Sequence, residues 1–405
     1  MKVAGIVAEY NPFHNGHLYQ LEQTRRITGA DFVVAVMSGN FLQRGEPAMV
    51  NKWERSRMAV INGADLVLEL PFAFACNHSG MFARGAVEIL NGLGLVTHLS
   101  FGAEEPDLTV LGKIAEITAL EEESYRQALR RASEEGLSYG AARQRAVEET
   151  GGLVLGEQMD KPNNILAIEY LRHLILTKSS IKPAAVKRKG PGYHDEIPFG
   201  DLASATCLRN MVKEGDPIQP YIPKATGEIL KEAGRPVFLE DFASLIFYRL
   251  LQQEDNSLAE IYSAGEGLEN RFAKFMRTSP NLPSLIQQVK SRRYAETRVK
   301  RMLFQSLMGL TKGRMDQILK EKLLYGRILA FNDRGRELIK MIRKGEGASI
   351  PLITNINKEI QEQDRLLPLL EMDILASDVY NLAAGLNRYG LSDFVQRPYY
   401  HKEKL

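Results

Sequence analysis

Residues 2–26, KVAGIVAEYNPFHNGHLYQLEQTRR, decide the fold of this chain. The apolar run Val3–Ala8 predicts a buried strand, the Asn11-Pro12 pair ends it, and residues 18–27 predict a helix. A strand that leads through a tight turn into a helix N-terminus forms an anion site, because unpaired backbone N–H groups and the helix dipole point at the turn. The opening of the chain therefore predicts a phosphate-binding site at the first strand of a sheet.

The same turn carries two histidines. His14 and His17 bracket Asn15-Gly16, and both imidazoles can donate hydrogen bonds to phosphate oxygens. Gly16 lets the backbone approach a ligand closely. The alternative is a pair of ordinary loop histidines bonded to the backbone. Because the strand, the turn and the glycine agree, we interpret the two histidines as the catalytic pair of a nucleoside triphosphate site.

The rest of the first half alternates between strand and helix patterns. Helices are expected at residues 51–62, 80–93 and 163–176, and further strands at residues 32–37, 66–69, 98–102 and 184–187. Such alternation is typical of a doubly wound parallel α/β sheet with helices on both faces. Ligands bind such sheets beyond the carboxyl ends of the strands, which is where the histidine turn lies.

Two domains are expected in a chain of 405 residues. Residues 1–220 would form the nucleotide-binding catalytic domain, with a helical insertion at about 108–150, where Ala, Glu, Arg and Leu recur at helical spacing. Residues 221–405 would form a mostly helical C-terminal domain with a small α/β unit at about 328–355.

The composition excludes several classes of protein. Hydrophobic residues make up 44% and charged residues 25%, as in a globular protein, and no apolar run approaches the ~20 residues that cross a membrane. Cys76 and Cys207 are the only cysteines, which argues against a structural zinc site and for a reducing compartment. With no recognisable signal peptide, we expect a cytoplasmic protein without a membrane partner. The net charge of +2 means that any basic binding surface is local.

Three further positions lie where strands are expected to end. Gly102 would let a base or a ribose approach the backbone. The amide of Asn163 suits the edge of adenine or a ribose hydroxyl, and capping of the next helix is the alternative. In the loop at residues 37–47, Gln43 and Arg44 would hold a carboxylate or a phosphate, with a solvated loop as an equal alternative.

Two arginines are expected to clamp phosphates. Arg188 lies in a run of three basic residues that leads into a glycine-rich loop, and its fork of donors suits a triphosphate. Arg209 follows Ser204 and Thr206 at the start of a helix, an arrangement that also favours an anion. A solvated charge run and a simple helix cap are the respective alternatives.

These motifs resemble known ones. His14-Asn15-Gly16-His17 resembles the HxGH signature of the nucleotidyltransferase superfamily. The element from Ser204 to Arg209 resembles the second phosphate clamp of that superfamily, with the usual paired hydroxyls interrupted by Ala205. Together with SGNFLQRGE, LELPF, SFGAE, PNNILA and KRKGPGYHD, they resemble the bacterial tRNA(Met) cytidine acetate ligase family over nearly the whole chain.

The resemblance implies an ATP-dependent ligase of HxGH nucleotidyltransferase fold that acetylates N4 of the wobble cytidine of elongator tRNA(Met). Acetate would attack the α-phosphate of ATP to give acetyl-adenylate and pyrophosphate, and the tRNA would then accept the acetyl group. Magnesium is expected to accompany ATP. The residues implied to contact ATP are Val7, Ala8, Glu9, Tyr10, Asn11, Pro12, Phe13, His14, Asn15, Gly16, His17, Leu18, Tyr19, Gln20, Gly102, Asn163 and Arg188, with Ser204, Thr206 and Arg209 as the second clamp.

A large nucleic-acid partner needs a basic surface, and residues 290–327 supply one. This segment holds eleven basic residues against three acidic ones. An amphipathic helix with solvated charges is the alternative. The expected phosphate contacts are Arg292, Arg293, Arg298 and Arg301, with Tyr294 and Phe304 as stacking faces.

Two other functions stay open at this point. A small-molecule adenylyltransferase would share the histidine site, but the usual compactness of such enzymes leaves the long C-terminal half unexplained. A non-catalytic RNA-binding module would explain the basic segment, but not two separate phosphate clamps.

Overall fold

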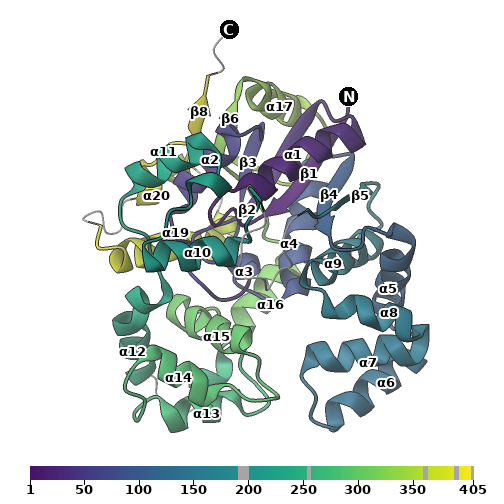
Figure 1. Ribbon diagram of the computed structural model, residues 1–405, viewed down its shortest axis with the longest axis vertical. Helices are drawn as coiled ribbons and strands as arrows, with labels where there is room; N and C mark the ends of the chain where they lie inside the picture. Colours follow the sequence, from purple (N-terminus) through teal and green to yellow (C-terminus); the bar gives the residue numbers. More distant parts are fainter. Residues whose placement is uncertain (190–199, 253–256, 359–363, 387–391, 403–405) are drawn as a thin grey trace.

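The centre of the protein is a β-sheet. The computed structural model describes residues 1–189, 200–252, 257–358, 364–386 and 392–402. Within these residues the sheet has eight strands in the order β5-β4-β1-β2-β3-β6-β7, and β8 pairs with β6 (Figure 1). The strands are β1 (Val3–Ala8), β2 (Phe32–Ser38), β3 (Leu66–Leu70), β4 (His98–Ala103), β5 (Lys182–Lys187), β6 (Gly326–Asn332), β7 (Leu352–Ile353) and β8 (Tyr399–His401).

The first five strands are all parallel. β1 lies between β2 and β4, and its register with β2 runs from Val3↔Phe32 to Ala8↔Met37. Every residue of β2 is buried, as expected for a parallel strand that is covered by helices on both sides. The predicted doubly wound parallel sheet is confirmed.

Alternate residues of each strand point to opposite faces of the sheet. Val34 packs in the core cluster that holds the buried face of α4 (Ser79–Gly92). The adjacent Val33 packs in a second cluster, which holds residues of α1 (Asn15–Thr28) and α2 (Lys52–Ile61). Thus α4 covers one face of the sheet, and α1 and α2 cover the other.

The predicted helical insertion follows β4. It consists of α5 (Leu108–Leu120), α6 (Glu123–Glu134), α7 (Tyr139–Gly151) and α8 (Leu153–Glu157), and α9 (Pro162–Leu176) leads back to the sheet. α9 contacts both α4 and α5, so it fixes the insertion to the body of the protein. These helices form the blue lobe at the lower right of Figure 1.

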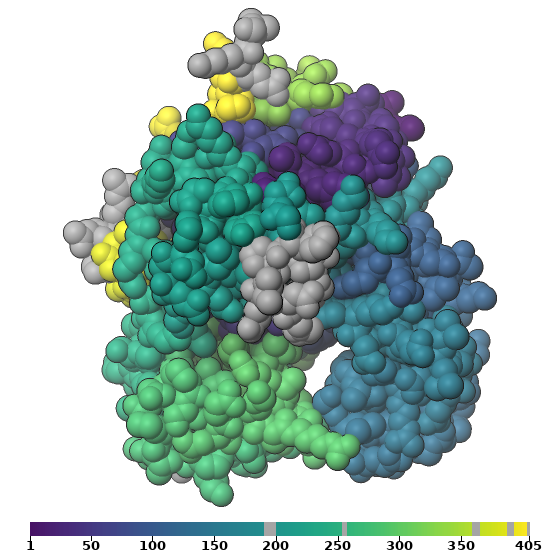
Figure 2. Space-filling view, in the orientation of Figure 1, coloured from purple at the N-terminus to yellow at the C-terminus, as the bar shows by residue number. Residues whose placement is uncertain are grey.

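The chain after β5 is mostly helical, as predicted. In Figure 2 an opening lies between the upper parts of the green lobe built by α12 to α15 and the blue insertion lobe, and the lower tip of the green lobe reaches the blue one in this view. No described helix is both long and apolar enough to cross a lipid bilayer. The helices of this part are α10 (Ala205–Glu214), α11 (Lys224–Ala233), α12 (Ala243–Leu251), α13 (Leu268–Phe275), α14 (Leu282–Val289), α15 (Glu296–Met308), α16 (Lys312–Glu321), α17 (Asp333–Lys344), α19 (Leu367–Ala383) and α20 (Ser392–Val395), while the short α3 (Phe72–Ala75) follows β3.

The sheet crosses the boundary that the sequence places near residue 220. β6 pairs antiparallel with β3, and β7 and β8 pair with β6. The expected α/β unit at about 328–355 therefore extends the first sheet instead of standing apart. A sheet edge carries a row of unpaired backbone groups, and β6 covers that edge of β3. The division into two domains stays a prediction.

Four buried charged side chains lie at this junction. Lys52 Nζ is 2.8 Å from Glu69 Oε1 and 2.9 Å from Asp393 Oδ2. Arg327 of β6 is 2.8 Å from the same oxygen of Asp393. Burial by itself raises the pKa of Asp393, but Arg327 and Lys52 hold that pKa below its ordinary value. The cluster joins α2, β3, β6 and α20 through charges that are paired inside the protein.

Candidate active site

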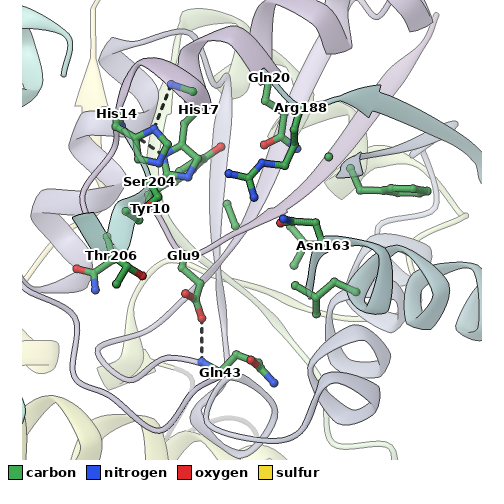
Figure 3. Close-up of a pocket in the computed structure, with 18 of the residues that line it drawn as sticks. Glu9, Tyr10, His14, His17, Gln20, Gln43, Asn163, Arg188, Ser204 and Thr206 are labelled. Atoms are coloured by element: carbon green, nitrogen blue, oxygen red, sulfur yellow. Dashed lines mark hydrogen bonds between the residues drawn. The ribbon is translucent and has the colours of Figure 1, made fainter. Parts of the chain in front are cut away.

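A cavity of about 230 Å³ lies at the carboxyl ends of β1, β4 and β5 (Figure 3). The cavity lies at the edge of the sheet where the sequence predicts the site. The cavity brings together both predicted histidines and both predicted arginines. Its walls come from residues 7–11, the start of α1, residues 42–46, Gly102, the start of α9, residues 186–189 and residues 202–209.

His14 and His17 cap the helix that they begin. His14 is the N-cap of α1, and its Nδ1 accepts a hydrogen bond from the N–H of Gly16 at 3.0 Å. His17 Nδ1 accepts from the N–H of His14 at 3.2 Å, and the two rings stack with centroids 3.7 Å apart. A neutral imidazole whose Nδ1 accepts carries its proton on Nε2. Each histidine therefore keeps one Nε2–H donor for a ligand.

Both histidines are neutral in the protein without ligand. Burial, together with the charges of Arg188 and Arg209, lowers the pKa of His14 to about 3. Burial also lowers the pKa of His17 well below its ordinary value, with added contributions from His14 and Arg188. At neutral pH the pair offers two uncharged donors, and the arginines supply the positive charge.

Arg188 and Arg209 reach the cavity from different segments. The stem of Arg188 lies over Gly102, where an added Cβ would be 3.4 Å from Arg188 Cγ. Arg209 donates to the carbonyl oxygen of Asn11 at 3.1 Å and to Thr206 Oγ1 at 3.2 Å. Arg209 is thus held against the turn between β1 and α1, whereas no described residue pairs with the guanidinium of Arg188.

Ser204 and Thr206 have separate structural roles beside the cavity. Ser204 is the N-cap of α10, and its Oγ accepts from the N–H of Cys207 at 3.0 Å. Thr206 binds Arg209, as described above. Since both residues line the cavity, the N-terminus of α10 lies there as well, and the cap and the anion site coexist.

Asn163 lines the cavity but does not cap α9. The N-cap position is Lys161, which makes no side-chain cap bond. The carboxylate of Glu104 accepts instead from Asn163 Nδ2 at 2.5 Å and from the N–H of Asn164 at 3.1 Å. The capping interpretation of Asn163 is therefore wrong, because an acidic residue after β4 satisfies the first turn of the helix and orients the amide.

The sequence did not indicate the apolar wall of the cavity. Phe101, Leu166, Tyr170 and Val186 line it beside Gly102, and the rings of Phe101 and Tyr170 are 5.8 Å apart. A wall of this kind suits a flat nucleobase. The register between β4 and β5 would have indicated this wall, because it pairs Gly102 with Val186. The sequence of one strand alone does not reveal that register.

Part of the predicted ATP-contacting stretch supports the turn instead of lining the cavity. Phe13 is fully buried, with its ring 4.9 Å from that of Tyr10. Asn15 Nδ2 donates to the carbonyl oxygens of Asp201 at 2.9 Å and Pro220 at 3.1 Å. These contacts fix the turn and the segment before α11. The predicted residues that do not line the cavity are Pro12, Phe13, Asn15 and Leu18.

The loop at residues 42–46 forms the opposite wall, and α15 supports it. Lys300 Nζ lies 2.8 Å from Glu46 Oε1. Arg301 Nη1 donates to the carbonyl oxygen of Gln43 at 3.3 Å. A helix of the basic segment therefore holds one wall of the cavity, a role that the sequence did not suggest.

This contact alters the interpretation of the basic segment. Arg301, predicted to contact tRNA, is half-buried against the loop at residues 42–46, and burial lowers its pKa to about 10. Arg327 is only 2% exposed, inside the charge cluster. Tyr294 and Phe304 are buried, so they do not present the expected stacking faces. The stacking faces are therefore corrected, because an amphipathic basic helix packs its inner face whatever its outer face binds, whereas the tRNA contact of Arg301 stays a prediction.

The remaining predicted tRNA contacts lie nearer the surface. Arg292 and Arg293 are exposed. Arg298 is half-buried and lies 2.6 Å from Glu266, which also approaches Arg293 at 4.0 Å. The basic segment is thus partly neutralised by its own surroundings.

Three further predictions concern metals, cysteines and the glycine-rich loop. The described residues hold no group of three or more His, Cys, Asp or Glu side chains placed to bind a metal ion. Cys76 and Cys207 are both free and buried. Residues 190–195 of the KRKGPGYHD motif lie outside the described residues.

Known proteins resemble this chain over nearly its whole length. The family model described as HIGH Nucleotidyl Transferase matches residues 1–391. The chain is 42% identical to the tRNA(Met) cytidine acetate ligase of Caldicellulosiruptor saccharolyticus, over 99% of both chains, and 42% identical to that of Acetivibrio thermocellus, over 94% of both. It is similar to the apo crystal structure of Thermotoga maritima TmcAL, with a TM-score of 0.94 at 31% identity, and to the form bound with alpha-thio ATP, with a TM-score of 0.92 at 32% identity, each over 100% of both chains.

Proposed function

Since the chain belongs to the tRNA(Met) cytidine acetate ligase family of HIGH nucleotidyltransferases, we propose that it is an ATP-dependent ligase that acetylates a cytidine of tRNA(Met). The observation that carries the proposal is the single cavity around which the neutral histidine pair, Arg188 and Arg209 converge. Uncharged N–H donors and guanidinium groups suit a triphosphate, whose oxygens gain charge during transfer. The relative bound to alpha-thio ATP supports the choice of nucleotide.

In the first step, an oxygen of acetate attacks the α-phosphorus of ATP. The new bond gives acetyl-adenylate as the bond to the β-phosphate oxygen breaks and pyrophosphate leaves. The Nε2–H groups of His14 and His17 donate to phosphate oxygens, while Arg188 and Arg209 neutralise the leaving group. Positioning and electrostatic stabilisation account for this step without a protein nucleophile. In the second step, N4 of the wobble cytidine of elongator tRNA(Met) attacks the acetyl carbonyl and AMP leaves.

Magnesium enters this scheme with the nucleotide. Glu9 and Glu46 are carboxylates that line the cavity, and each already accepts a bond, from the Gln43 N–H and from Lys300. The described residues hold no group of three or more His, Cys, Asp or Glu side chains placed to bind the ion themselves, and Mg²⁺ prefers the phosphate oxygens. When bound there, the ion would neutralise charge on the triphosphate.

The proposed reaction also assigns binding surfaces for ATP and tRNA and a location for the protein. We place ATP on the residues between 7 and 20 that line the cavity, apart from the acidic Glu9, and on Gly102, Asn163 and Arg188, with Ser204 and Thr206 supporting Arg209. We place tRNA against the C-terminal helical part, where Arg292, Arg293 and Arg298 offer charge near the surface. A cytoplasmic location suits both the free cysteines and a tRNA substrate.

The experiment is acetylation with labelled acetate. Purified protein, ATP and acetate without tRNA should give acetate-dependent exchange of pyrophosphate into ATP, and added tRNA(Met) transcript should take up the label. Acetyl-CoA in place of acetate and ATP should leave the tRNA unlabelled. Pyrophosphate release that depends on a small phosphorylated acceptor, with no label in tRNA, would indicate a small-molecule adenylyltransferase instead.

A further inference from the structure

Among the described residues, two carboxylates line the cavity. Glu46 is paired with Lys300, whereas Glu9 forms no salt bridge with a described residue. Glu9 follows β1 directly, on the strand that leads to the histidine turn, and it lines the cavity. A negative side chain beside a triphosphate is repelled by it. Its presence among His14, His17, Arg188 and Arg209 therefore points to a partner that carries a hydrogen-bond donor.

The two oxygens of Glu9 have different surroundings. Oε1 accepts a hydrogen bond from the N–H of Gln43 at 2.8 Å, shown as the dashed line beside Glu9 in Figure 3. No described residue donates to Oε2, although Glu9 borders the cavity. The backbone of Glu9 is also fixed, because its carbonyl oxygen accepts from Arg55 Nη1 at 2.6 Å. The carboxylate is thus held in place with one oxygen available.

The charged groups around Glu9 come from three different segments. Arg209 of α10 and Arg55 of α2 favour the ionised form, whereas Glu46 of the loop at residues 42–46 opposes it. Burial is the largest influence and leaves the pKa of Glu9 above its ordinary value. A carboxylate of raised pKa is a better proton acceptor than an exposed one.

The proposed reaction supplies a matching donor. Acetate and the triphosphate present only acceptor atoms. The adenine amine and the ribose hydroxyls of ATP are donors, but we place the nucleoside against the apolar wall and Asn163. The exocyclic amine of cytosine presents two N–H groups, and a carboxylate is the usual acceptor for them. Building on the function proposed above, we propose that Glu9 Oε2 receives the N4 amino group of the acceptor cytidine, orients it towards the acetyl carbonyl and takes its proton. A uracil would place its O4 acceptor against the same carboxylate and be rejected.

Acetyl transfer forms one bond to N4 and breaks one bond to the phosphate of AMP. The lone pair of N4 forms the new N–C bond at the acetyl carbonyl carbon, and the carbonyl π electrons move to oxygen. Glu9 takes one proton from N4. The carbonyl then re-forms as the C–O bond to the phosphate of AMP breaks, and AMP leaves with that electron pair. The products are N4-acetylcytidine, AMP and a protonated Glu9, which returns its proton to water.

The test measures the two half-reactions separately in the Glu9→Gln variant. Glutamine keeps an oxygen for the N–H of Gln43, so the loop stays in place, but it cannot accept a proton. Single-turnover transfer of labelled acetyl from pre-formed acetyl-adenylate to tRNA(Met) transcript should fall at least about a hundredfold. Acetate-dependent pyrophosphate exchange should fall far less. Transfer by the wild-type protein should rise with pH as Glu9 ionises, and the variant should lose that rise.

The matched control is Glu22→Gln. Glu22 is exposed on α1 and lies outside the cavity, so this change removes the same charge without touching the site, and transfer should stay at the wild-type rate. A Glu9→Gln protein that transfers acetyl as fast as wild type, with the same pH profile, would overturn the inference alone. An equal fall in both half-reactions, with a higher KM for ATP or Mg²⁺, would assign Glu9 to the nucleotide. Failure of the wild-type protein to label tRNA would overturn the proposed function as well.

Discussion

Each histidine of the pair uses one ring nitrogen for the backbone and keeps the other for a ligand. The sequence could predict these two positions because the strand, the turn and Gly16 are local features. It could not predict that the helix cap occupies Nδ1 of both rings, or that both rings are neutral. Those properties depend on burial and on arginines that lie far along the chain.

The cap and the donor of His14 can be separated by mutation. Asparagine is a good N-cap whose side-chain oxygen can accept from Gly16, but it lacks a group that reaches as far as Nε2–H. We expect His14→Asn to fold normally and to lose ~3 kcal/mol of transition-state stabilisation, or about a hundredfold in rate. The measurement is acetate-dependent pyrophosphate exchange. His98→Gln, at the opposite end of β4, is the control, and an unimpaired His14→Asn protein would contradict the assignment.

A buried histidine outside the site makes stability depend on pH. Burial lowers the pKa of His173 to about 4, whereas the unfolded chain binds that proton near the ordinary value of 6.5. As pH falls below about 6.5, the unfolded state binds more protons, so His173 weakens the folded state by up to ~1.4 kcal/mol per pH unit. Asp373 acts in the opposite sense, because burial and Glu69 raise its pKa to about 7.

The contribution of His173 to the pH dependence of stability can be isolated by comparing the wild-type protein with His173→Gln. His173→Gln should unfold more readily than wild type at pH 7.5, and this deficit should shrink as the pH falls through about 6 towards 5. Urea unfolding of both proteins at matched pH values measures the difference. A deficit that stays constant with pH would show that His173 titrates normally in the folded protein.

At the scale of elements, the strands and the helices that cover the sheet could be predicted well from the sequence. Each strand of a buried parallel sheet appears in the sequence as a continuous run of apolar residues. Val3–Ala8 is an example, since the predicted and observed bounds agree. The role of α15 could not be predicted, because its contact with the loop at residues 42–46 joins segments that are distant in the chain. Gly45, with φ of 73°, lies so close that an added Cβ would be 2.3 Å from the backbone nitrogen of Arg301.

Removing one contact between α15 and the loop at residues 42–46 should slow the first half-reaction. Arg301→Met keeps most of the buried volume but loses the hydrogen bond to the carbonyl oxygen of Gln43. The loop then shifts, and a misplacement of this kind slows adenylation by about ten- to a hundredfold. Pyrophosphate exchange without tRNA is the readout, with exposed Arg293→Met as the control. If Arg301→Met weakens tRNA binding alone, Arg301 contacts RNA as the sequence predicted.

At the scale of the whole molecule, our proposal places ATP at the cavity beside the sheet and tRNA on the C-terminal helical lobe. The sequence predicted that both lobes exist, but not that the sheet continues into the C-terminal half, because an apolar strand does not reveal which neighbour it will pair with. Of the eleven basic residues in the segment at 290–327, Lys300, Arg301 and Arg327 pack against the cavity wall or inside the charge cluster and are structural. Only the outer members are left for RNA.

Fewer basic residues are therefore predicted to contact tRNA than the charge of the segment suggests. Arg292→Glu combined with Arg293→Glu should weaken tRNA(Met) binding, and loss of each phosphate contact should reduce the slope of log K against log salt by ~0.7–0.9. Binding measured across a salt series tests this, and pyrophosphate exchange without tRNA should change by less than about twofold. An unchanged affinity and slope would move the RNA to another surface.

The pairing of β6 with β3 also has a consequence for synthesis of the protein. When β3 leaves the ribosome, β2 is already made and can pair with one of its edges, but β6 follows only after roughly 250 further residues, or about ten to fifty seconds of translation. During that interval Lys52 and Glu69 have only each other, since Arg327 and Asp393 are still to be translated. The nascent chain thus carries an open strand edge for much of its time on the ribosome, and this edge is the place where a chaperone or a pause in translation would protect it.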